Sequence, residues 1–174
     1  MMKKIWLIGG TSWHSTIDYY KGINQLAAEK IGSNVNPELL LHSINIEVMR
    51  SGDHSRIIEK YTVVSKSLEN QGAEAIVICA NTPHLVYEKV LPTLNIPILH
   101  IGDAIAQEAK NNDLKTLGLL GTKATMEGDF IKKYIKDKYD IDVILPEEKE
   151  QPKIHDLISK ELTQGIFASK TKAY

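Results

Sequence analysis

One stretch of the chain, residues 75–84, constrains the fold more than any other, because a buried strand there meets a polar turn. The apolar run at residues 75–78 precedes Cys79, and the chain then becomes polar at Asn81, Thr82 and Pro83. A short apolar run bounded by turn residues is typical of a strand buried on both faces. Thr82 can cap a helix and Pro83 suits a first helical turn, so the stretch predicts a strand, a loop and a helix.

Cys79, the single cysteine of the chain, lies where the predicted strand ends and the predicted helix begins. Unpaired backbone N–H groups at a helix start favour the thiolate and lower the pKa of a cysteine. Ligands of open α/β sheets bind at this same edge. A lone cysteine at the end of a buried strand is otherwise a small core residue. The adjoining Asn81 and Thr82, whose side chains can hydrogen-bond a carboxylate or an oxyanion, favour the functional interpretation.

Apolar runs of strand length alternate with helical patterns along the chain. Strands are predicted at residues 5–8, 39–44, 75–78, 97–101, 116–120 and 142–145. Helices are predicted at residues 15–31, 55–71, 83–90, 103–111, 126–139 and 152–164, with Asp103 capping the fourth. The polar segment at residues 49–55 is predicted as a loop. This alternation indicates an α/β fold with a mostly parallel sheet and helices on both faces.

The chain contains an internal echo, since residues 5–11 and residues 117–122 share the plan of strand, glycine, threonine and helix. The echo predicts two similar α/β halves that face each other across a cleft. We place the first domain, which carries Cys79, at residues 1–103 and the second at residues 104–174. The Gly9-Gly10 turn lacks the G-x-G-x-x-G spacing, so a nucleotide-binding loop is not indicated.

Charge and cysteine content narrow the classes of partner and compartment. The 174 residues carry 21 basic and 22 acidic side chains, a formal net charge of −1, which indicates neither a nucleic-acid nor a membrane surface. One cysteine excludes a disulfide framework and suits a reducing environment, so we expect a cytoplasmic protein. The apolar run at residues 5–8 is too short for a signal peptide or a membrane span.

Five blocks of sequence resemble, in order, the cofactor-independent aspartate/glutamate racemases, and within them the broad-specificity bacterial amino-acid racemases. The blocks are residues 8–16 with Tyr19 and Tyr20 behind them, residues 77–84, residues 99–104, residues 119–127 and residues 161–162. The resemblance implies two pseudo-symmetric, doubly wound α/β domains with an amino acid between them, each supplying one catalytic cysteine. It also implies that neither pyridoxal phosphate nor a metal takes part.

The resemblance assigns roles to particular residues. Cys79 matches the first catalytic cysteine, which exchanges the α-proton of the substrate as thiolate and thiol. Asn81 and Thr82 match residues that hold the α-carboxylate. Further substrate-binding candidates are Thr11, Ser12, Thr122, Thr125 and Thr163. The first four of these would otherwise serve as helix caps. His84 would tune the thiolate or lie on the surface of a helix.

The chain departs from the family pattern in two respects. No cysteine follows Cys79, whereas the resemblance places a second catalytic cysteine in a Gly-Cys-Thr-Glu block near the chain end. Gly9 precedes Cys79 by 70 residues, and the same spacing from Gly121 runs past Tyr174, so we expect a truncated second domain and impaired racemisation. Thr11, His14 and Thr163 also stand where relatives carry other residues. The substrate is therefore expected only as aspartate, glutamate or a similar amino acid.

Two alternative functions remain open from the residues. A catalytically inactive remnant would still fold, and the exposed strand edges and apolar surface of a partial domain would favour a homodimer. A decarboxylase or isomerase of the same superfamily would use one cysteine, and Asn81 and Thr82 suit any carboxylate substrate.

Overall fold

The computed structural model describes residues 3–172, and the chain divides into two compact units, Met1–Leu99 and His100–Tyr174. The division lies a few residues before the boundary that the sequence places at residues 103 and 104. Both units combine helices with parallel strands, which confirms the predicted α/β class. Among the described residues, no helix has the length and apolar character needed to cross a membrane.

The first unit is built on a parallel sheet with the strand order β2-β1-β3-β4. The strands are β1 (Ile5–Gly9), β2 (Leu41–Ser43), β3 (Ala75–Ile78) and β4 (Ile98–Leu99). At the centre, Ile8 of β1 pairs with Ile78 of β3, and Leu7 pairs with Leu41 on the other side. The continuous apolar runs of β1 and β3 form central strands because helices cover both of their faces.

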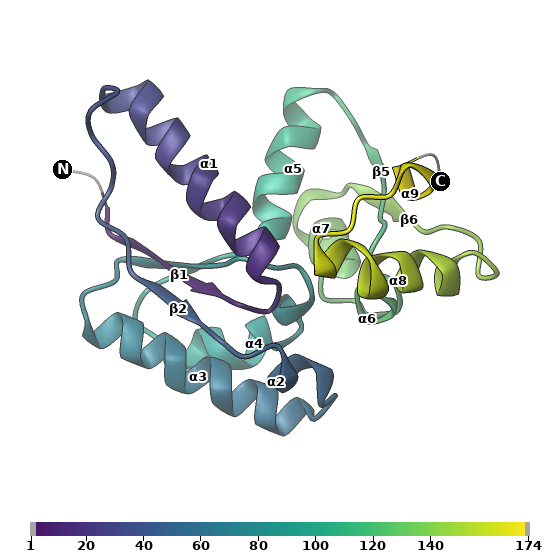
Figure 1. Cartoon of the computed structure of the whole chain (residues 1–174), viewed down its shortest axis with the longest axis horizontal. Helices are drawn as coiled ribbons and strands as arrows, with labels where there is room; N and C mark the ends of the chain where they lie inside the picture. The colour runs from purple at the N-terminus through teal and green to yellow at the C-terminus, as the bar shows by residue number, and fades with distance from the viewer. Residues whose placement is uncertain (1–2, 173–174) are drawn as a thin grey trace. The chain divides into compact units, whose positions relative to one another are not determined.

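Helices flank this sheet on both sides, as predicted, with α1 on one face and α3 and α4 on the other (Figure 1). They are α1 (Trp13–Ile31), α2 (Glu47–Arg50), α3 (His54–Asn70) and α4 (Tyr87–Val90), with 3-10 turns at Thr82–Val86 and Leu91–Thr93. The loop predicted at residues 49–55 is wrong at both ends, because α2 ends only at Arg50 and α3 begins at His54. Asn45 and Ile46, which precede α2, accept its first hydrogen bonds.

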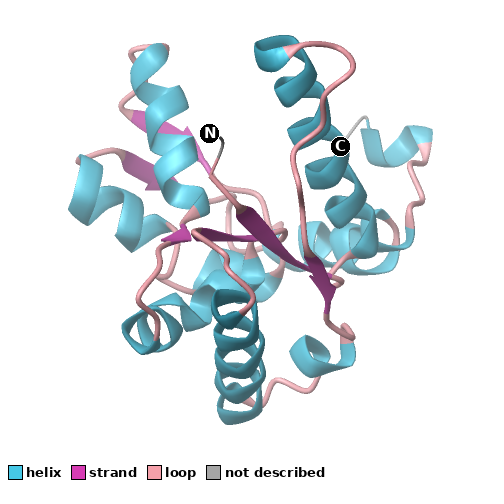
Figure 2. Cartoon of the chain, turned by 90° about the vertical axis from the view of Figure 1, so that its left-hand side faces the viewer, coloured by secondary structure: helices cyan, strands magenta, loops and turns pink. Residues whose placement is uncertain are grey.

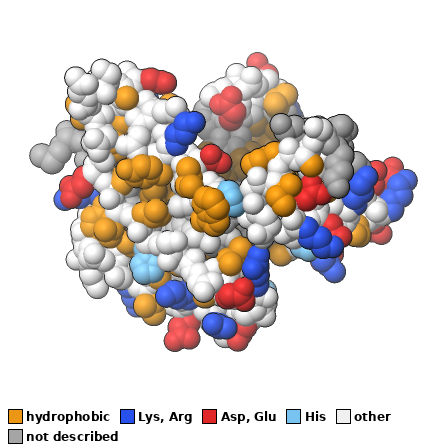
Figure 3. Space-filling model, in the orientation of Figure 1, with side chains coloured by type: hydrophobic (Ala, Val, Ile, Leu, Met, Phe, Trp, Pro, Cys, Tyr) orange, Lys and Arg blue, Asp and Glu red, His pale blue; other side chains and the backbone are white. Residues whose placement is uncertain are grey.

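The main hydrophobic core lies between the sheet and α3. Side chains at helical spacing on α3 are buried there, namely Ile57, Tyr61, Val64 and Leu68. They pack with strand residues such as Trp6, Ile8 and Ile76. Each buried side chain of this size stabilises the fold by about 1.5–3 kcal/mol through removal of apolar surface from water. By contrast, α1 buries only Thr16 completely, and hydrophobic side chains lie at the surface along it (Figure 3).

The second unit contains two parallel strands, β5 (Thr116–Gly118) and β6 (Asp142–Ile144). Its helices are α5 (Ile101–Asn111), α6 (Lys123–Glu127), α7 (Lys132–Tyr139), α8 (Gln151–Lys160) and α9 (Ser169–Lys172), with a 3-10 turn at Leu162–Gln164. Figure 2 shows which segments of each unit are helices, strands and loops. A smaller core of α5, α7 and strand residues holds this unit together, including Ala106, Ile131 and Ile135.

The single helix predicted at residues 126–139 is wrong, since the chain forms two helices, α6 and α7, separated around Gly128. The Gly128 N–H donates to the Ala124 carbonyl and ends α6. A Cβ at this position would lie 2.6 Å from the Phe130 ring and 2.7 Å from the Ala124 carbonyl oxygen. Only glycine therefore lets the chain turn back so closely.

The predicted cap of α5 is also wrong, because His100 caps this helix in place of Asp103. The Nδ1 atom of His100 accepts the Gly102 N–H at 3.0 Å, and the imidazole stacks on Tyr134 with the ring centroids 3.7 Å apart. His100 is buried, so the stack and the cap together fix the start of α5. A histidine is an uncommon cap, and helix-capping preferences alone favour the aspartate.

Asp103 instead joins α5 to α7 through one carboxylate oxygen. Its Oδ1 atom accepts hydrogen bonds from the Tyr139 hydroxyl at 2.6 Å, the Tyr134 hydroxyl at 2.8 Å and the Lys138 ammonium at 2.9 Å. Burial on its own would raise the pKa of Asp103, but the three hydrogen bonds and the lysine charge bring this pKa below its ordinary value. Hydrogen bonds to a charged acceptor are stronger than neutral ones.

We expect the substitution Asp103→Ala to lower the free energy of unfolding by about 1–3 kcal/mol at neutral pH, because hydrogen bonds to a charged group are lost. Since the folded-state pKa is depressed, this contribution is present above the ordinary aspartate pKa, about 4, and is lost as the pH falls through the folded-state value. Urea denaturation at neutral and acidic pH measures both effects. Asp156→Ala, which removes only an exposed ion pair with Lys160, is the matched control. Equal losses in the free energy of unfolding for Asp103→Ala and Asp156→Ala would contradict the stabilising role assigned to the Asp103 hydrogen bonds.

Candidate functional site

The candidate site of the first unit lies at the carboxyl ends of β1 and β3, the two central strands. The strand order β2-β1-β3-β4 changes direction between them, and ligands of open α/β sheets bind at such a reversal. The Cys79 N–H continues the ladder by donating to the Ile8 carbonyl at 2.9 Å. The chain that follows β1 and the chain that follows β3 therefore leave the sheet side by side.

The loop after β1 is held tightly against the end of β2, and glycine makes this approach feasible. Gly10 has a φ angle of +89°, and a Cβ there would lie 2.2 Å from the Ile44 carbonyl oxygen. Its N–H donates to the Thr16 hydroxyl at 3.0 Å. Ser12 caps α1, with its side chain accepting the Ser15 N–H at 3.5 Å. Ser12 thus has the capping role that the sequence allows, and its contact with substrate stays a prediction.

Thr11 pairs with a tyrosine that the sequence does not single out. The Thr11 hydroxyl lies 2.8 Å from the hydroxyl of Tyr61, a side chain of α3 that is only 1% exposed. Burial raises the pKa of Tyr61 to about 12, while the hydrogen bond with Thr11 acts to lower it and a thiolate charge on Cys79 would add to the rise. The same two influences, burial and the Cys79 charge, raise the pKa of Tyr19. Two protonated phenols therefore lie near the sulfur.

Cys79 itself is completely buried, and the expected lowering of its pKa is wrong. Burial raises the pKa of the Cys79 thiol to about 12. The physical reason is local. The segment that follows is a short 3-10 turn, so few aligned peptide dipoles face the sulfur, and removal from water outweighs their field. The Ser15 hydroxyl donates to the Cys79 carbonyl at 2.8 Å and fastens α1 to this point of the chain.

Two residues of the segment after Cys79, Thr82 and His84, have other positions and contacts than the sequence predicts. The predicted capping role of Thr82 is wrong, because Thr82 begins a 3-10 turn whose cap position is Asn81, and no side chain makes the capping bond. His84 is buried and does not lie on a helix surface, with Nδ1 3.0 Å from the Ala80 carbonyl oxygen and 3.2 Å from that of Asn81. Burial lowers the pKa of His84, so the neutral ring holds the turn that carries Asn81.

The remaining predicted site residues belong to the second unit. Thr122 caps α6, and its hydroxyl lies 3.4 Å from the Thr125 amide nitrogen and 3.1 Å from the Thr125 hydroxyl. Thr125 is buried against Gly121. The Thr163 hydroxyl donates to the Ser159 carbonyl at 2.8 Å. These threonines therefore make helix-capping or helix-end contacts, and their contact with substrate stays a prediction.

Three residues near the sulfur were not predicted as site residues, namely Ser15, Tyr19 and Tyr61. Tyr19 belongs to a block that carries the family resemblance, whereas Tyr61 occupies an apolar position of α3 and gives no polar signal in the sequence. Across residues 3–172, the structure groups no three His, Cys, Asp or Glu side chains that could hold a metal ion.

Comparison with known proteins places these features in context. A family model described as Asp/Glu/hydantoin racemase matches residues 8–174. The broad specificity amino-acid racemase RacX of Bacillus subtilis is 29% identical over 84 residues, which are 48% of this chain and 37% of RacX. The matched part therefore spans little more than a third of that relative's length.

Two solved structures resemble the whole described fold. A putative Asp/Glu racemase from Yersinia pestis has a TM-score of 0.88 and 34% identity, over 99% of this chain and 76% of that one. An aspartate racemase homologue from Pyrococcus horikoshii has a TM-score of 0.83 and 36% identity, with the same coverage. The α/β fold with parallel sheets thus matches that of racemase structures.

The raised pKa of Cys79 predicts that the folded protein holds a thiol, with no thiolate, up to about pH 9. The thiolate is followed by its ultraviolet absorbance, as the difference between the unaltered chain and Cys79→Ser at each pH. The urea-unfolded chain is the control and should titrate near the ordinary cysteine pKa, about 8.5. A thiolate signal that is complete below about pH 9 in the folded protein would contradict a pKa of about 12.

Proposed function

The chain belongs to the Asp/Glu/hydantoin racemase family, and we propose that it exchanges the α-hydrogen of an amino acid through Cys79. The observation that carries this proposal is the position of the cysteine. It follows β3 directly, at the reversal point of the sheet, and is bonded through its backbone to β1. Aspartate, glutamate or a similar amino acid is the proposed substrate, in keeping with the names of RacX and the two structural relatives.

The proposed chemistry transfers one proton. The Cys79 thiolate removes the α-hydrogen as a proton, the pair of electrons from the C–H bond stays on carbon, and Cys79 becomes a thiol. A carbanion beside a carboxylate is stabilised by hydrogen-bond donors fixed around that carboxylate. Asn81 and Thr82 stand next to the sulfur in the chain and are the proposed donors. Return of a proton from Cys79 to the same face restores the original enantiomer.

The surroundings of Cys79 favour the thiol, with a pKa of about 12. The proposed reaction therefore requires an interaction that lowers this pKa when the substrate binds. The hydroxyls of Tyr61, which is buried, and of Tyr19, which is partly buried, stay protonated because their pKa values are also raised. They can therefore donate to a sulfur that carries charge. In the proposed reaction, a bound cationic amino group supplies the further field that lowers the thiol pKa, since an opposite charge nearby favours the ionised form.

Inversion requires a second acid on the opposite face of the α-carbon. The 174-residue sequence holds one cysteine, so a second thiol does not come from it. We therefore propose that this chain exchanges the α-hydrogen with solvent faster than it inverts the amino acid. Exchange with retention results when the Cys79 thiol gives the abstracted proton to solvent, takes up a solvent deuteron, and delivers that deuteron to the same face of the carbanion.

The complete burial of Cys79 favours a second candidate, a chain that folds without catalysing a reaction. A third candidate is decarboxylation with protonation by a single thiol, a reaction that the protonated Cys79 suits. These candidates differ in what they do to amino acids and to malonates, so one set of assays separates them.

The test is incubation of L- and D-aspartate and L- and D-glutamate with the protein in deuterium oxide. Loss of the α-proton signal is followed by NMR, and inversion is followed by chiral chromatography. We expect deuterium incorporation that exceeds inversion. Removal of the base by Cys79→Ala should reduce the exchange rate by about 10²-fold or more.

The matched control is Ser65→Ala, which truncates another small buried side chain, on α3, that is not among the proposed site residues. It should leave the exchange rate unchanged. Neither exchange nor inversion of any of the four amino acids would refute the proposal for this chain. Decarboxylation of an aryl malonate that depends on Cys79, without amino-acid exchange, would favour the single-thiol alternative.

A further inference from the structure

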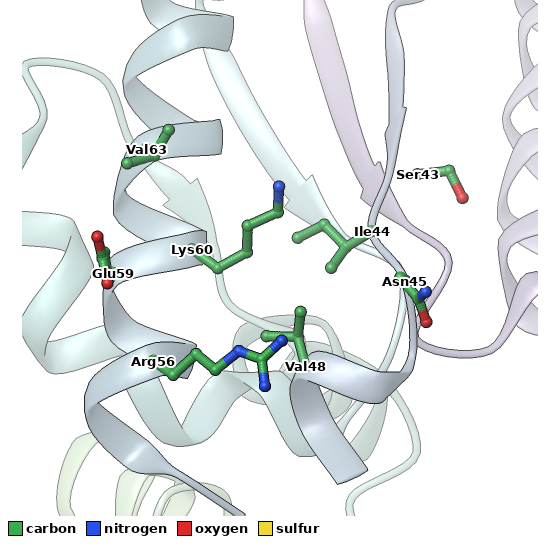
Figure 4. Close-up of a pocket in the computed structure, with 8 residues that line it drawn as sticks. All are labelled: Ser43, Ile44, Asn45, Val48, Arg56, Glu59, Lys60 and Val63. Atoms are coloured by element: carbon green, nitrogen blue, oxygen red, sulfur yellow. The ribbon is translucent and has the colours of Figure 1, made fainter. Parts of the chain in front are cut away.

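A pocket lies in the first unit beside the end of β2, and Cys79 is not among the residues that line it (Figure 4). It has a volume of about 430 Å³, which falls in the range of small-molecule sites. The end of β2, α2 and the outer face of α3 line it, through Ser43, Ile44, Asn45, Val48, Arg56, Glu59, Lys60 and Val63. We call it the α3 pocket. None of these residues is among the site residues that the sequence predicts.

Two cations of α3 extend into this pocket. Lys60 extends from the helix toward Ile44, and Arg56 extends toward Val48, whereas Glu59 lies on the other side of the helix ribbon (Figure 4). The cations are one helical turn apart, at i and i+4, so their head groups share one face of α3. Lys60 is half-buried and its charge helps to lower the pKa of His42 on β2, after burial, the larger cause. The positive field of Lys60 therefore reaches the edge of the sheet.

Neither cation is neutralised within the part of the chain that the structure describes. Lys60 and Arg56 form no ion pair there, although ion pairs occur throughout both units. Glu59 also lines the pocket, but its side chain lies on the other side of the helix ribbon from the two cations (Figure 4). Two further carboxylates have other partners. Glu47 pairs with Arg50 at 3.4 Å, and Asp53 accepts the backbone N–H of Arg56 at 3.1 Å as the cap of α3. Two like charges on one helix face repel each other unless an anion lies between them.

The walls of the pocket between the cations are apolar. Ile44 and Val48 are buried core residues that present side chains to it, and Val63 is 59% exposed at its upper end. Beside them lies β2, the edge strand of the sheet, and within residues 3–172 no strand pairs with its outer backbone groups. A ligand here would meet positive charge at one end and hydrocarbon at the other.

We propose that the α3 pocket binds a small organic oxyanion, a carboxylate or a phosphate on a short apolar body. The guanidinium of Arg56 suits the head group because its planar fork matches both carboxylate and phosphate, and the Lys60 ammonium adds a second donor. Ile44, Val48 and Val63 contact the body. This site is separate from Cys79 and does not depend on the proposed exchange of the α-hydrogen.

The test is isothermal titration calorimetry at low ionic strength with two probes that carry a phenyl ring, phenyl phosphate and phenylacetate. Their relative affinities distinguish a phosphate from a carboxylate head group. Benzyl alcohol, which keeps the ring and lacks the charge, is the uncharged comparison. We expect both anions to bind with one site and benzyl alcohol to show no binding.

Lys60→Met keeps the apolar stem and removes the charge, and should weaken binding of the anions about tenfold or more, as expected for loss of a charged hydrogen bond. Arg56→Gln should act in the same direction. Lys66→Met removes an exposed lysine of the same helix outside the pocket and should leave the affinity unchanged. Near-ultraviolet circular dichroism establishes that the variants are folded.

Three results would overturn the proposal. The first is absence of binding of either anion to the unaltered protein. The second is equal weakening by Lys66→Met and Lys60→Met, which would mean a response to net charge. The third is binding that neither Lys60→Met nor Arg56→Gln weakens, which would place the anion at another site. None of these results bears on deuterium exchange at the α-carbon, so this proposal and the proposed function fail independently.

Discussion

The parallel pairing of β1 with β3 is the interaction on which the candidate site depends. It aligns Ile8 with Ile78, and the Cys79 N–H adds one more rung by donating to Ile8. Because the ladder extends to the cysteine itself, the Cys79 backbone has the rigidity of the sheet, while the loop after β1 lies alongside. The Ser15 hydroxyl completes this frame from α1. A reacting sulfur needs such a frame, since misplacement of a catalytic group by a small distance lowers the rate strongly.

Two opposing effects act on the Cys79 thiol, and the structure determines which is larger. Backbone N–H groups at a helix start stabilise a thiolate, but this contribution falls off outside the first turn and is at most about 2 kcal/mol. Complete burial shifts the pKa of an ionisable group by up to 3–5 units, which is larger, since one unit is about 1.4 kcal/mol. In this chain the turn at Thr82–Val86 is a 3-10 segment, and burial prevails. The proposed reaction therefore relies on a charged substrate to change the protonation of the sulfur.

The strands were predictable because the apolar pattern that identifies each strand lies within its own few residues. Runs such as residues 75–78 are apolar whatever surrounds them, and the parallel arrangement follows from their alternation with helices. The errors arise where one side chain decides between local alternatives. Gly128 divides the predicted helix 126–139 because Phe130 folds back against it. His100 caps α5 because Tyr134, more than thirty residues later, stacks on its ring. The hydrophobic periodicity of either segment carries no information about contacts between residues that are distant in the sequence.

The candidate site was predictable to the same extent and for the same reason. Cys79, Thr11 and Ser12 stand at strand ends, so the alternation alone places them at one edge of the sheet. Tyr61 could not be identified, because a tyrosine at an apolar helix position looks like any other core residue. Its hydroxyl becomes part of the candidate site only because α3 packs on the sheet and brings the hydroxyl to Thr11. The same packing leaves Arg56 and Lys60 on the outer face of α3. One amphipathic helix thus supplies a buried hydroxyl to the candidate site and two cations to the α3 pocket.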